Sequence, residues 1–372
     1  MKVLHLLATG GTGGIEVLCK DILLKSDLDN RICCLFDEGE IFKSLKEQNK
    51  NIFSLKKENR DLKKIVNDLT KYCINEKIDI VTVHHGGVKC NLVYIMLKKR
   101  LPNLKYVRYL HGCFDKYAFG NDEGILNRLF IKIAMQKAFD CSDLLIFVSK
   151  AVEKSFEIKF NIKSKNKAII YNGIDEKFFC EPKIKKNEED MTDIIFVGRL
   201  TYVKGVDILI KAFNEVRKKN NNVSLTIVGD GEEREKLIEL SEKLEIRDKV
   251  KFVGRQTNVI EWLDKSDIFV YPSIWEEGFG ISVVEAMARG CIPITFKRGA
   301  LPEIIENNKN GILVDEINVE KLASAIEQII IMDKDEKIKL INSAKATAIK
   351  FSINNMLDKL RNEYTNLINS NE

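Results

Sequence analysis

Short apolar runs alternate with amphipathic helical stretches along the whole chain, and this alternation limits the possible folds more than any other sequence feature. Helical spacing is clear, for example, in Val206, Leu209 and Phe213. Strands that alternate with helices form parallel sheets, so the sequence predicts an α/β fold. The predicted strands are residues 2–8, 31–36, 78–83, 104–110, 143–148, 167–170, 193–197, 223–228, 249–253, 267–271, 291–295 and 311–314.

The chain is long enough for two domains, each with its own parallel sheet. Its 372 residues exceed the size of an ordinary single domain, which is roughly 100–200 residues. Residues 181–192 (EPKIKKNEEDMT) are polar, contain a proline and lack periodicity, which indicates a linker. We therefore predict a first domain at residues 1–178 and a second at 179–351.

Composition excludes several classes of protein. Hydrophobic residues make up 45% of the chain and charged residues 31%, as in a globular protein with a core. No apolar run approaches the ~18–20 residues that span a bilayer, and the N-terminus lacks the pattern of a signal peptide, so we expect a cytoplasmic location. The nine cysteines are scattered without C-x-x-C spacing, which predicts free thiols. Few aromatic residues accompany the basic stretches, which argues against nucleic-acid binding.

Charge is distributed unevenly between the two halves. The first 180 residues hold 31 basic and 22 acidic residues, whereas the rest hold 29 basic and 33 acidic. A helix predicted over residues 53–72 carries six of these basic residues, and apolar residues within 92–97 adjoin Lys98, Lys99 and Arg100. Such surfaces are typical either of peripheral docking on the anionic inner face of a cell membrane or of ordinary solvated helices, and both interpretations stay open. The six basic residues are Lys56, Lys57, Arg60, Lys63, Lys64 and Lys71.

The segment YPSIWEEGFGISVVEAMARG, at residues 271–290, contains the strongest chemical signal. A strand ends at Tyr271, and a helix is predicted to begin near Gly280 and Ile281. Ligands of parallel sheets bind beyond the carboxyl ends of strands, and the free N–H groups of a helix start attract anions. Glu285, one helical turn further on, is placed to accept hydrogen bonds from ribose hydroxyls. Glu277 lies on the loop before this helix. If the anion is the phosphate group of a nucleotide, Glu277 is placed to contact the part of the ligand beyond the phosphates.

Glu277 and Glu285, separated by seven residues, resemble the E-x7-E signature of glycosyltransferase family 4. The segment VGRLTYVKG, at residues 197–205, is similar to that family's G-R-L-x-x-x-K-G motif. The resemblance implies a GT-B fold, in which two Rossmann-like α/β/α domains face each other across a cleft that holds the active site. It also implies retaining transfer of a sugar from a nucleotide diphosphate, most commonly UDP. Arg199 and Lys204 would bind the donor diphosphate. This agrees with elementary electrostatics, because cations stabilise the negative charge on a departing phosphate.

The resemblance extends over most of the chain. The glycine loop GGTGGIE, at residues 10–16, resembles a phosphate-binding loop of the family, so Gly13 and Gly14 would contact the donor. Strand ends at 228–232 and 252–254 resemble the walls of the nucleoside pocket, which includes Gly254. The backbone of Phe279, Gly280 and Ile281 would hold the sugar or the distal phosphate. A final helix, about 352–372, would pack back on the first domain.

The four histidines are expected to have different roles. By resemblance, His111 would reach the donor sugar and act with Glu277 as a catalytic residue. His84 and His85 close a predicted strand, and we expect one to line the acceptor side and the other to be structural. His5 lies within the first strand and is expected to pack in the core.

No metal or other cofactor is expected, because Arg199, Lys204 and helix N-termini supply positive charge. The two D-x-D strings, at residues 27–29 and 333–335, lie in polar turns. Family members that build capsular or exopolysaccharide units imply a glycan or polyprenyl-diphosphate-linked acceptor. Two alternatives remain: an isomerase of the same fold, similar to a UDP-GlcNAc 2-epimerase, and a glycosyltransferase that modifies proteins. Phosphorylase chemistry is disfavoured because no segment suggests a pyridoxal phosphate lysine.

Overall fold

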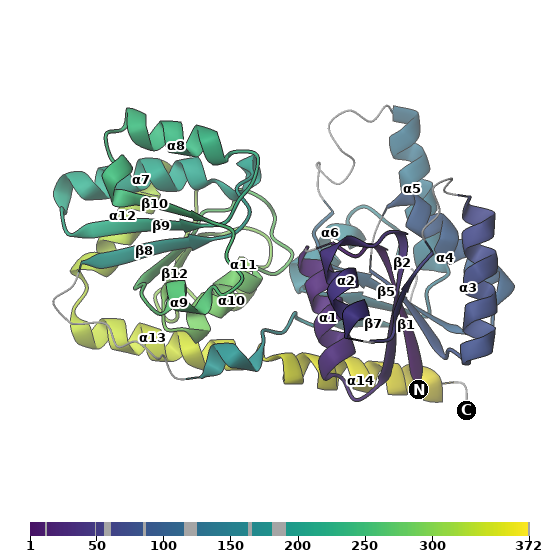
Figure 1. Ribbon diagram of the computed structural model, residues 1–372. Coiled ribbons are helices and arrows are strands. Elements are labelled where there is room, and N and C mark those ends of the chain that lie inside the picture. The colour runs from purple at the N-terminus through teal and green to yellow at the C-terminus, as the bar shows by residue number, and fades with distance from the viewer. Residues whose placement is uncertain are drawn as a thin grey trace. The chain divides into compact units, whose positions relative to one another are not determined.

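A computed structural model describes residues 1–11, 13–48, 50–55, 61–84, 87–114, 125–162, 166–180 and 191–370. The chain divides into two compact units (Figure 1). Unit 1 comprises Met1–Gly173 and Ile353–Glu372, and unit 2 comprises Ile174–Ser352.

Unit 1 contains a seven-stranded parallel sheet in the order β3-β2-β1-β4-β5-β6-β7. Every strand predicted in this part of the sequence is present, and β3 is an additional one. The strands are β1 (Lys2–Thr9), β2 (Asp29–Asp37), β3 (Ile52–Ser54), β4 (Ile80–Val83), β5 (Lys105–Leu110), β6 (Leu144–Phe147) and β7 (Lys167–Ile169).

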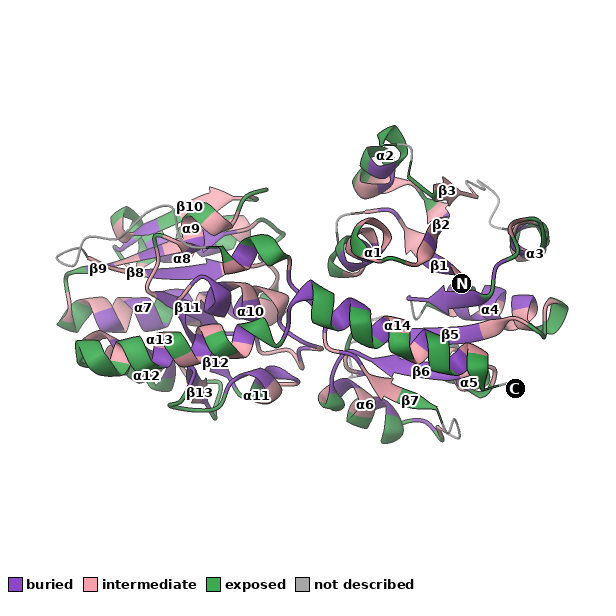
Figure 2. Cartoon of the chain, turned by 90° about the horizontal axis from the view of Figure 1, so that it is seen from below, coloured by how far each residue is buried: buried purple, intermediate pink, exposed green. Residues whose placement is uncertain are grey.

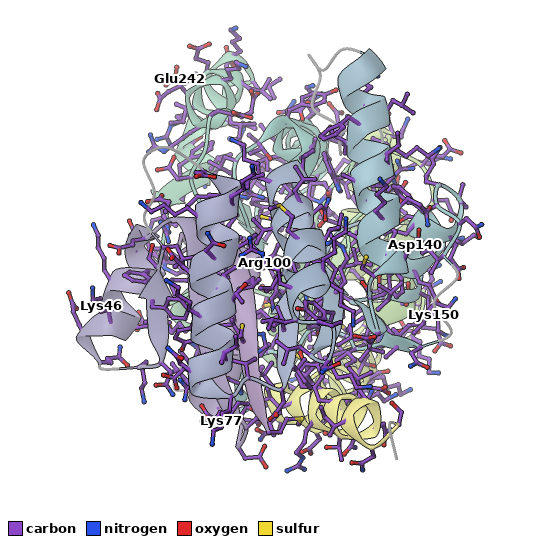
Figure 3. All side chains as sticks on the ribbon, turned by 90° about the vertical axis from the view of Figure 1, so that its right-hand side faces the viewer. Lys46, Lys77, Arg100, Asp140, Lys150 and Glu242 are labelled. Atoms are coloured by element: carbon purple, nitrogen blue, oxygen red, sulfur yellow. The ribbon has the colours of Figure 1, made fainter. Side chains whose placement is uncertain are left out.

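Helices cover both faces of this sheet because successive residues of its strands face opposite sides. Helices α3 and α4 pack on the face formed by Leu4, Leu6 and Val81, and Figure 3 looks onto α3, α4 and α5 side by side, with Arg100 marking the end of α4. Helices α1, α6 and α14 pack on the opposite face, against Val3 and Ile80. The helices are α1 (Gly14–Lys25), α2 (Gly39–Glu47), α3 (Leu62–Glu76), α4 (Val88–Arg100), α5 (Ile125–Asp140), α6 (Lys150–Glu157) and α14 (Ile353–Asn369).

Helix α14 is the last element of the chain, yet it belongs to the core of unit 1. Figure 2 shows its buried side along β5 and β6 and its exposed side toward solvent. Its Tyr364 hydroxyl lies 2.8 Å from Thr82 Oγ1 on β4, and both residues are fully buried. Each fully buried apolar side chain of α14 stabilises the folded state by roughly 2 kcal/mol. The buried residues of α14 are Ile353, Met356, Leu357, Leu360, Tyr364 and Leu367.

Unit 2 contains a six-stranded parallel sheet in the order β10-β9-β8-β11-β12-β13. Its strands are β8 (Thr192–Val197), β9 (Val223–Val228), β10 (Val250–Gly254), β11 (Ile268–Tyr271), β12 (Ile292–Phe296) and β13 (Ile312–Val314). Its helices are α7 (Val206–Lys219), α8 (Arg234–Lys243), α9 (Ile260–Leu263), α10 (Ile281–Ala288), α11 (Leu301–Ile304), α12 (Val319–Ile331) and α13 (Lys334–Ile349). Two parallel sheets flanked by helices confirm the predicted α/β fold.

The strand order reverses once within each sheet, between β1 and β4 in unit 1 and between β8 and β11 in unit 2. At such a point the connections leave the two strands toward opposite faces, which opens a crevice at their carboxyl ends. The residues that follow β1 and β4 therefore form one candidate ligand edge, and those that follow β8 and β11 form another.

One expectation about the basic surface was wrong, and the structure favours one of the two interpretations left open for residues 92–97. The predicted helix over residues 53–72 does not exist as such, because β3 ends at Ser54 and α3 begins at Leu62. Lys56, Lys57 and Arg60 lie outside the described residues. In α4, Val93 and Leu97 are buried in the core, and Leu92, Ile95 and Met96 are half-buried, so this stripe faces the protein. Among the described residues, no helix is both long and apolar enough to cross a membrane.

Candidate functional site

One basic, one acidic and one phenolic side chain meet where β8 and β11 end. Lys204 Nζ lies 2.6 Å from Glu277 Oε1 and 2.6 Å from the Tyr271 hydroxyl. The Ser273 hydroxyl donates a hydrogen bond to the same carboxylate oxygen. The exposed fractions of the Lys204 and Glu277 side chains are only 15% and 11%. A charge pair so shielded from water interacts more strongly than an exposed one.

Burial and neighbouring groups raise the pKa values of both Lys204 and Tyr271. Burial alone disfavours the ammonium of Lys204, but Tyr271 and Glu277 outweigh it, so the pKa of Lys204 lies above its usual value. Burial, reinforced by the negative charge of Glu277, raises the pKa of Tyr271 to about 12. At neutral pH this edge of unit 2 therefore presents a fixed cation beside a neutral phenol.

Close backbone contacts hold the two loops of this site together. The Ile274 N–H donates to the Val203 carbonyl at 3.0 Å. Gly205 has φ +64° and separates the 3-10 helix Tyr202–Lys204 from α7, and a Cβ on it would lie 2.2 Å from the Pro272 carbonyl oxygen. Only glycine fits at this point, because both the left-handed conformation and the contact exclude a side chain. The position of Lys204 thus depends on the glycine that follows it.

A third loop, after β12, completes the support of Glu277, and the sequence interpretation missed it. The Gly299 N–H donates to Glu276 Oε2 at 2.6 Å, and Arg298 pairs with Glu276 Oε1 at 2.9 Å. The Ala300 N–H donates to the Glu277 carbonyl at 2.8 Å. Tyr271 and Ser273 were also missed as site residues. The rule that ligands bind beyond strand ends would have indicated all of them.

Helix α10 begins as predicted. Gly280, with φ +102°, is the residue before its first turn, and Ile281 is its first residue. The N–H groups of a first helical turn have no acceptors within the helix and attract anions. Phe279 is buried, and its ring packs edge-to-face on Phe351. Glu285 is half-buried one turn into α10.

The other predicted donor contacts are at strand ends or at a helix start. Arg199 is exposed, two residues beyond β8, and Gly254 ends β10 with φ +68°. In unit 1, Gly13 and Gly14 form the start of α1 and are exposed. The carboxylate of Glu16 lies against Gly13 and accepts a hydrogen bond from Thr9, so this helix start already carries a negative charge.

Three of the four histidines form one line of hydrogen bonds in unit 1. His5 Nδ1 lies 2.9 Å from His84 Nε2, and His84 Nδ1 lies 3.0 Å from His111 Nε2. His5 and His84 are buried, and His111 is half-buried. The roles predicted for His84 and His85 stay predictions, and His85 lies outside the described residues. His111 follows β5 directly, and its contact with the donor sugar stays a prediction.

Acid should destabilise the protein through His5. Burial lowers its pKa from 6.5 to about 4, so the unfolded chain binds a proton there more readily than the folded one. The contribution of neutral His5 to the free energy of unfolding is fully present above pH 6.5, and it declines as the pH falls toward 4. We expect a loss of about 2 kcal/mol between pH 7 and pH 5. Calorimetric melts should show the loss in the wild type and not in a His5→Phe variant; equal losses in both would contradict this.

Known families and proteins match most of this chain. Residues 13–178 match the model of Glycosyltransferase Family 4, and residues 179–347 match that of Glycosyl transferases group 1. An uncharacterized glycosyltransferase of Methanocaldococcus jannaschii is 30% identical over 79% of this chain and 77% of its own length. The chain belongs to glycosyltransferase family 4. It is therefore a glycosyltransferase, and a GT-B fold agrees with its two parallel sheets.

Other proteins are similar to this chain over different extents. A second uncharacterized glycosyltransferase of M. jannaschii is 34% identical, but the match covers 59% of either chain. A Campylobacter jejuni enzyme is 26% identical over 69% of either chain, and its name is N-acetylgalactosamine-N,N'-diacetylbacillosaminyl-diphospho-undecaprenol 4-alpha-N-acetylgalactosaminyltransferase. Crystal structures of Anabaena HepE with UDP and with UDP-glucose each superpose with a TM-score of 0.81 at 21% identity. Each superposition covers 98% of this chain. The UDP complex is covered over 100% of its length and the UDP-glucose complex over 99%, which supports the GT-B fold.

Proposed function

We propose that this glycosyltransferase transfers a sugar from a UDP-sugar to a hydroxyl of a glycan or of a lipid-linked glycan, with retention at the anomeric carbon. The observation that carries the proposal is the shielded Lys204–Glu277 pair where β8 and β11 end, beside the start of α10. A diphosphate needs a fixed cation and free N–H groups, and a sugar needs a carboxylate to accept from its hydroxyls. This edge of unit 2 offers all three.

In the proposed reaction, the acceptor oxygen bonds to the anomeric carbon on the face from which UDP departs. The bond between that carbon and the diphosphate oxygen breaks, and the acceptor proton passes to the departing diphosphate. Lys204 and Arg199 would stabilise the charge that develops on the diphosphate, and preorganised charges of this kind act mainly on the transition state. Glu277 would orient the donor sugar, and Glu285 the ribose. Because these cations neutralise the diphosphate, the proposed reaction needs no metal.

Relatives support the choice of donor and acceptor. HepE has been crystallised with UDP and UDP-glucose, and the C. jejuni enzyme is named for a diphospho-undecaprenol acceptor and an alpha linkage. UDP-hexoses are α-linked, so an α-linked product corresponds to retention. We therefore favour a lipid-linked acceptor in surface polysaccharide synthesis over a protein acceptor.

The test is the stereochemistry of the product. Purified protein is incubated with UDP-sugars and polyprenyl-diphosphate-linked sugars in the presence of EDTA, and the anomeric proton of the product is observed by NMR. We expect UDP release, an α-linked product and no loss of rate in EDTA. A β-linked product would contradict retention. An epimerised UDP-sugar without transfer would support the isomerase alternative instead.

Helix α5 supports peripheral attachment to an anionic membrane. Leu129, Phe130 and Ile133 are 54%, 49% and 45% exposed, and the exposed cations Arg128 and Lys132 lie among them. The N-terminal part of α5 extends beyond α3 and α4 (Figure 3). Exposed apolar side chains with adjacent cations are typical of helices that insert into a lipid interface.

Replacing Leu129, Phe130 and Ile133 together by serine should reduce binding to vesicles about tenfold or more, because apolar insertion is lost. Sedimentation with phosphatidylglycerol vesicles measures the bound fraction. A matched variant replaces the exposed Ile331 and Ile349 of unit 2 by serine and should bind as the wild type does. Equal binding by both variants, or no preference over phosphatidylcholine vesicles, would contradict attachment through α5.

A further inference from the structure

Tyr271 is the partner of Lys204 that the sheet of unit 2 supplies. Lys204 lies in a short 3-10 helix and Glu277 lies in a loop, whereas Tyr271 is the last residue of β11. Its ring is buried and stacks nearly parallel to the rings of Phe196 and Phe269, with ring centres 6.0 and 6.1 Å away. Because protein interiors are close-packed, a ring packed in this way does not shift easily. The Tyr271 hydroxyl is therefore a fixed point at the end of the strand.

The direction of each hydrogen bond among Lys204, Tyr271 and Glu277 follows from the chemistry of the groups. Lys204 Nζ lies 2.6 Å from the Tyr271 hydroxyl oxygen but 5.0 Å from the ring centre, so the ammonium meets the oxygen and not the face of the ring. An ammonium only donates, so this oxygen accepts. Tyr271 also forms a hydrogen bond with Glu277, and because a carboxylate only accepts, the phenol donates there. Lys204 donates to Glu277 as well, which closes a ring of three hydrogen bonds.

Two of the three N–H groups of Lys204 are used within this ring. Among the residues that the structure describes, Tyr271 and Glu277 are the acceptors within hydrogen-bond distance of Nζ. The third N–H therefore points away from both of them and is available to an anion. A lysine side chain is long and flexible, so a contact with Glu277 alone would let Nζ pivot about that carboxylate oxygen. The second contact, which comes from a strand end, fixes the position of Nζ.

We propose that Tyr271 is a positioning residue that holds the Lys204 ammonium in place, so that its third N–H faces the donor diphosphate. Because Tyr271 is only 4% exposed, it acts through Lys204. A cation that is already in place needs no rearrangement when negative charge develops on the departing group, and such preorganisation acts on the transition state. The diphosphate as the target rests on the proposed function, whereas the anchoring of the ammonium does not.

The anchoring is measured by NMR on protein labelled with ¹⁵N-lysine. The ¹H–¹⁵N signal of the Lys204 ammonium is assigned by its disappearance in Lys204→Met, and the exchange of its hydrogens with water is measured. Hydrogens held by buried acceptors exchange slowly, so we expect Lys204 to exchange more slowly than Lys211, whose side chain is 45% exposed. A wild-type Lys204 ammonium that exchanges as fast as that of Lys211 would overturn the proposal, whatever the variants do.

The variant Tyr271→Phe keeps the ring and its packing but removes the acceptor for Lys204. Exchange of the Lys204 hydrogens should become about tenfold faster, which corresponds to the loss of one hydrogen bond to a charged group. The matched control is Tyr364→Phe, which removes an equally buried hydroxyl from unit 1, where it lies 2.8 Å from Thr82 Oγ1. The control should leave the Lys204 signal unchanged. Unchanged exchange in Tyr271→Phe, or equal acceleration in the control, would overturn the proposal.

Kinetics then separates this inference from the proposed function. If transfer is observed, Tyr271→Phe should lower kcat about tenfold and leave KM for the UDP-sugar within about twofold, since the anchored cation acts on the transition state. Added to Lys204→Met, the same change should alter kcat by less than about twofold, because its target is gone. A full tenfold loss in the double variant would contradict action through Lys204. If no UDP-sugar is turned over, the proposed function fails, and the exchange measurement still decides whether Tyr271 anchors the ammonium.

Discussion

Replacing Lys204 by methionine should reduce kcat/KM for the UDP-sugar about a thousandfold, which corresponds to removal of one preorganised charge from the departing group. Methionine keeps the length and most of the volume of the side chain, so the change is chiefly one of charge. It leaves Glu277, whose side chain is 11% exposed, without its cation, and stability should fall by about 3 kcal/mol.

The matched variant is Lys211→Met. Lys211 also lies in unit 2 and pairs with an acidic residue, Asp207, but its side chain is 45% exposed. An exposed pair of this kind contributes at most about 0.5 kcal/mol, so both activity and stability should stay close to the wild type. Steady-state kinetics and urea unfolding test the two variants together. Wild-type activity in Lys204→Met would contradict the role proposed for this cation.

Gly205→Ala should destabilise unit 2 more than Lys204→Met does, with a loss above about 4 kcal/mol or failure to fold. The new Cβ would lie 2.2 Å from the Pro272 carbonyl oxygen, and the backbone has φ +64°. Movement of either loop would displace Lys204 from Tyr271 and Glu277. Loss of donor binding should therefore accompany the loss of stability.

Gly254→Ala separates the cost of the left-handed backbone from the cost of the contact with Pro272. Gly254 has nearly the same conformation, φ +68°, but a Cβ added to it would meet no described atom within 4 Å. The left-handed conformation alone costs about 1–2 kcal/mol for alanine, and that is the loss we expect. Both tryptophans, Trp262 and Trp275, belong to unit 2, so their fluorescence in urea reports this unit. Similar losses in both variants would contradict the contact with Pro272.

The α/β fold could be predicted from the sequence because buried parallel strands are continuous apolar runs. These runs identified every strand except β3, whose three half-buried residues Ile52–Ser54 form no recognisable run. The same short strand explains the wrong helix over residues 53–72, since its apolar residues were assigned to the helical stripe of α3. The stripe of α4 was ambiguous because apolar residues beside lysines look alike whether they face a core or a membrane.

The motifs predicted which residues lie at the strand ends, but not which of them touch. The pairing of Lys204 with Glu277 depends on β8 and β11 being neighbours, and strand order is not visible in a pattern of apolar runs. The line of hydrogen bonds through His5, His84 and His111 was missed for the same reason, because it crosses three strands that are distant in the sequence. The apolar surface of α5 could have been suspected from Leu129, Phe130 and Ile133, which recur at helical spacing beside Arg128 and Lys132.

The most direct test of the central claim, that unit 2 binds a UDP-sugar through Lys204, is a thermal shift measurement with a panel of nucleotide sugars. The wild type, Lys204→Met, Glu285→Ala and Lys211→Met are compared. A ligand at about 100 times its Kd stabilises the folded state by roughly 2.7 kcal/mol, which gives a clear rise in Tm. We predict that at least one UDP-sugar raises the Tm of the wild type and of Lys211→Met, and of neither of the other two. Equal shifts in all four proteins, or no shift with any nucleotide sugar, would contradict the account.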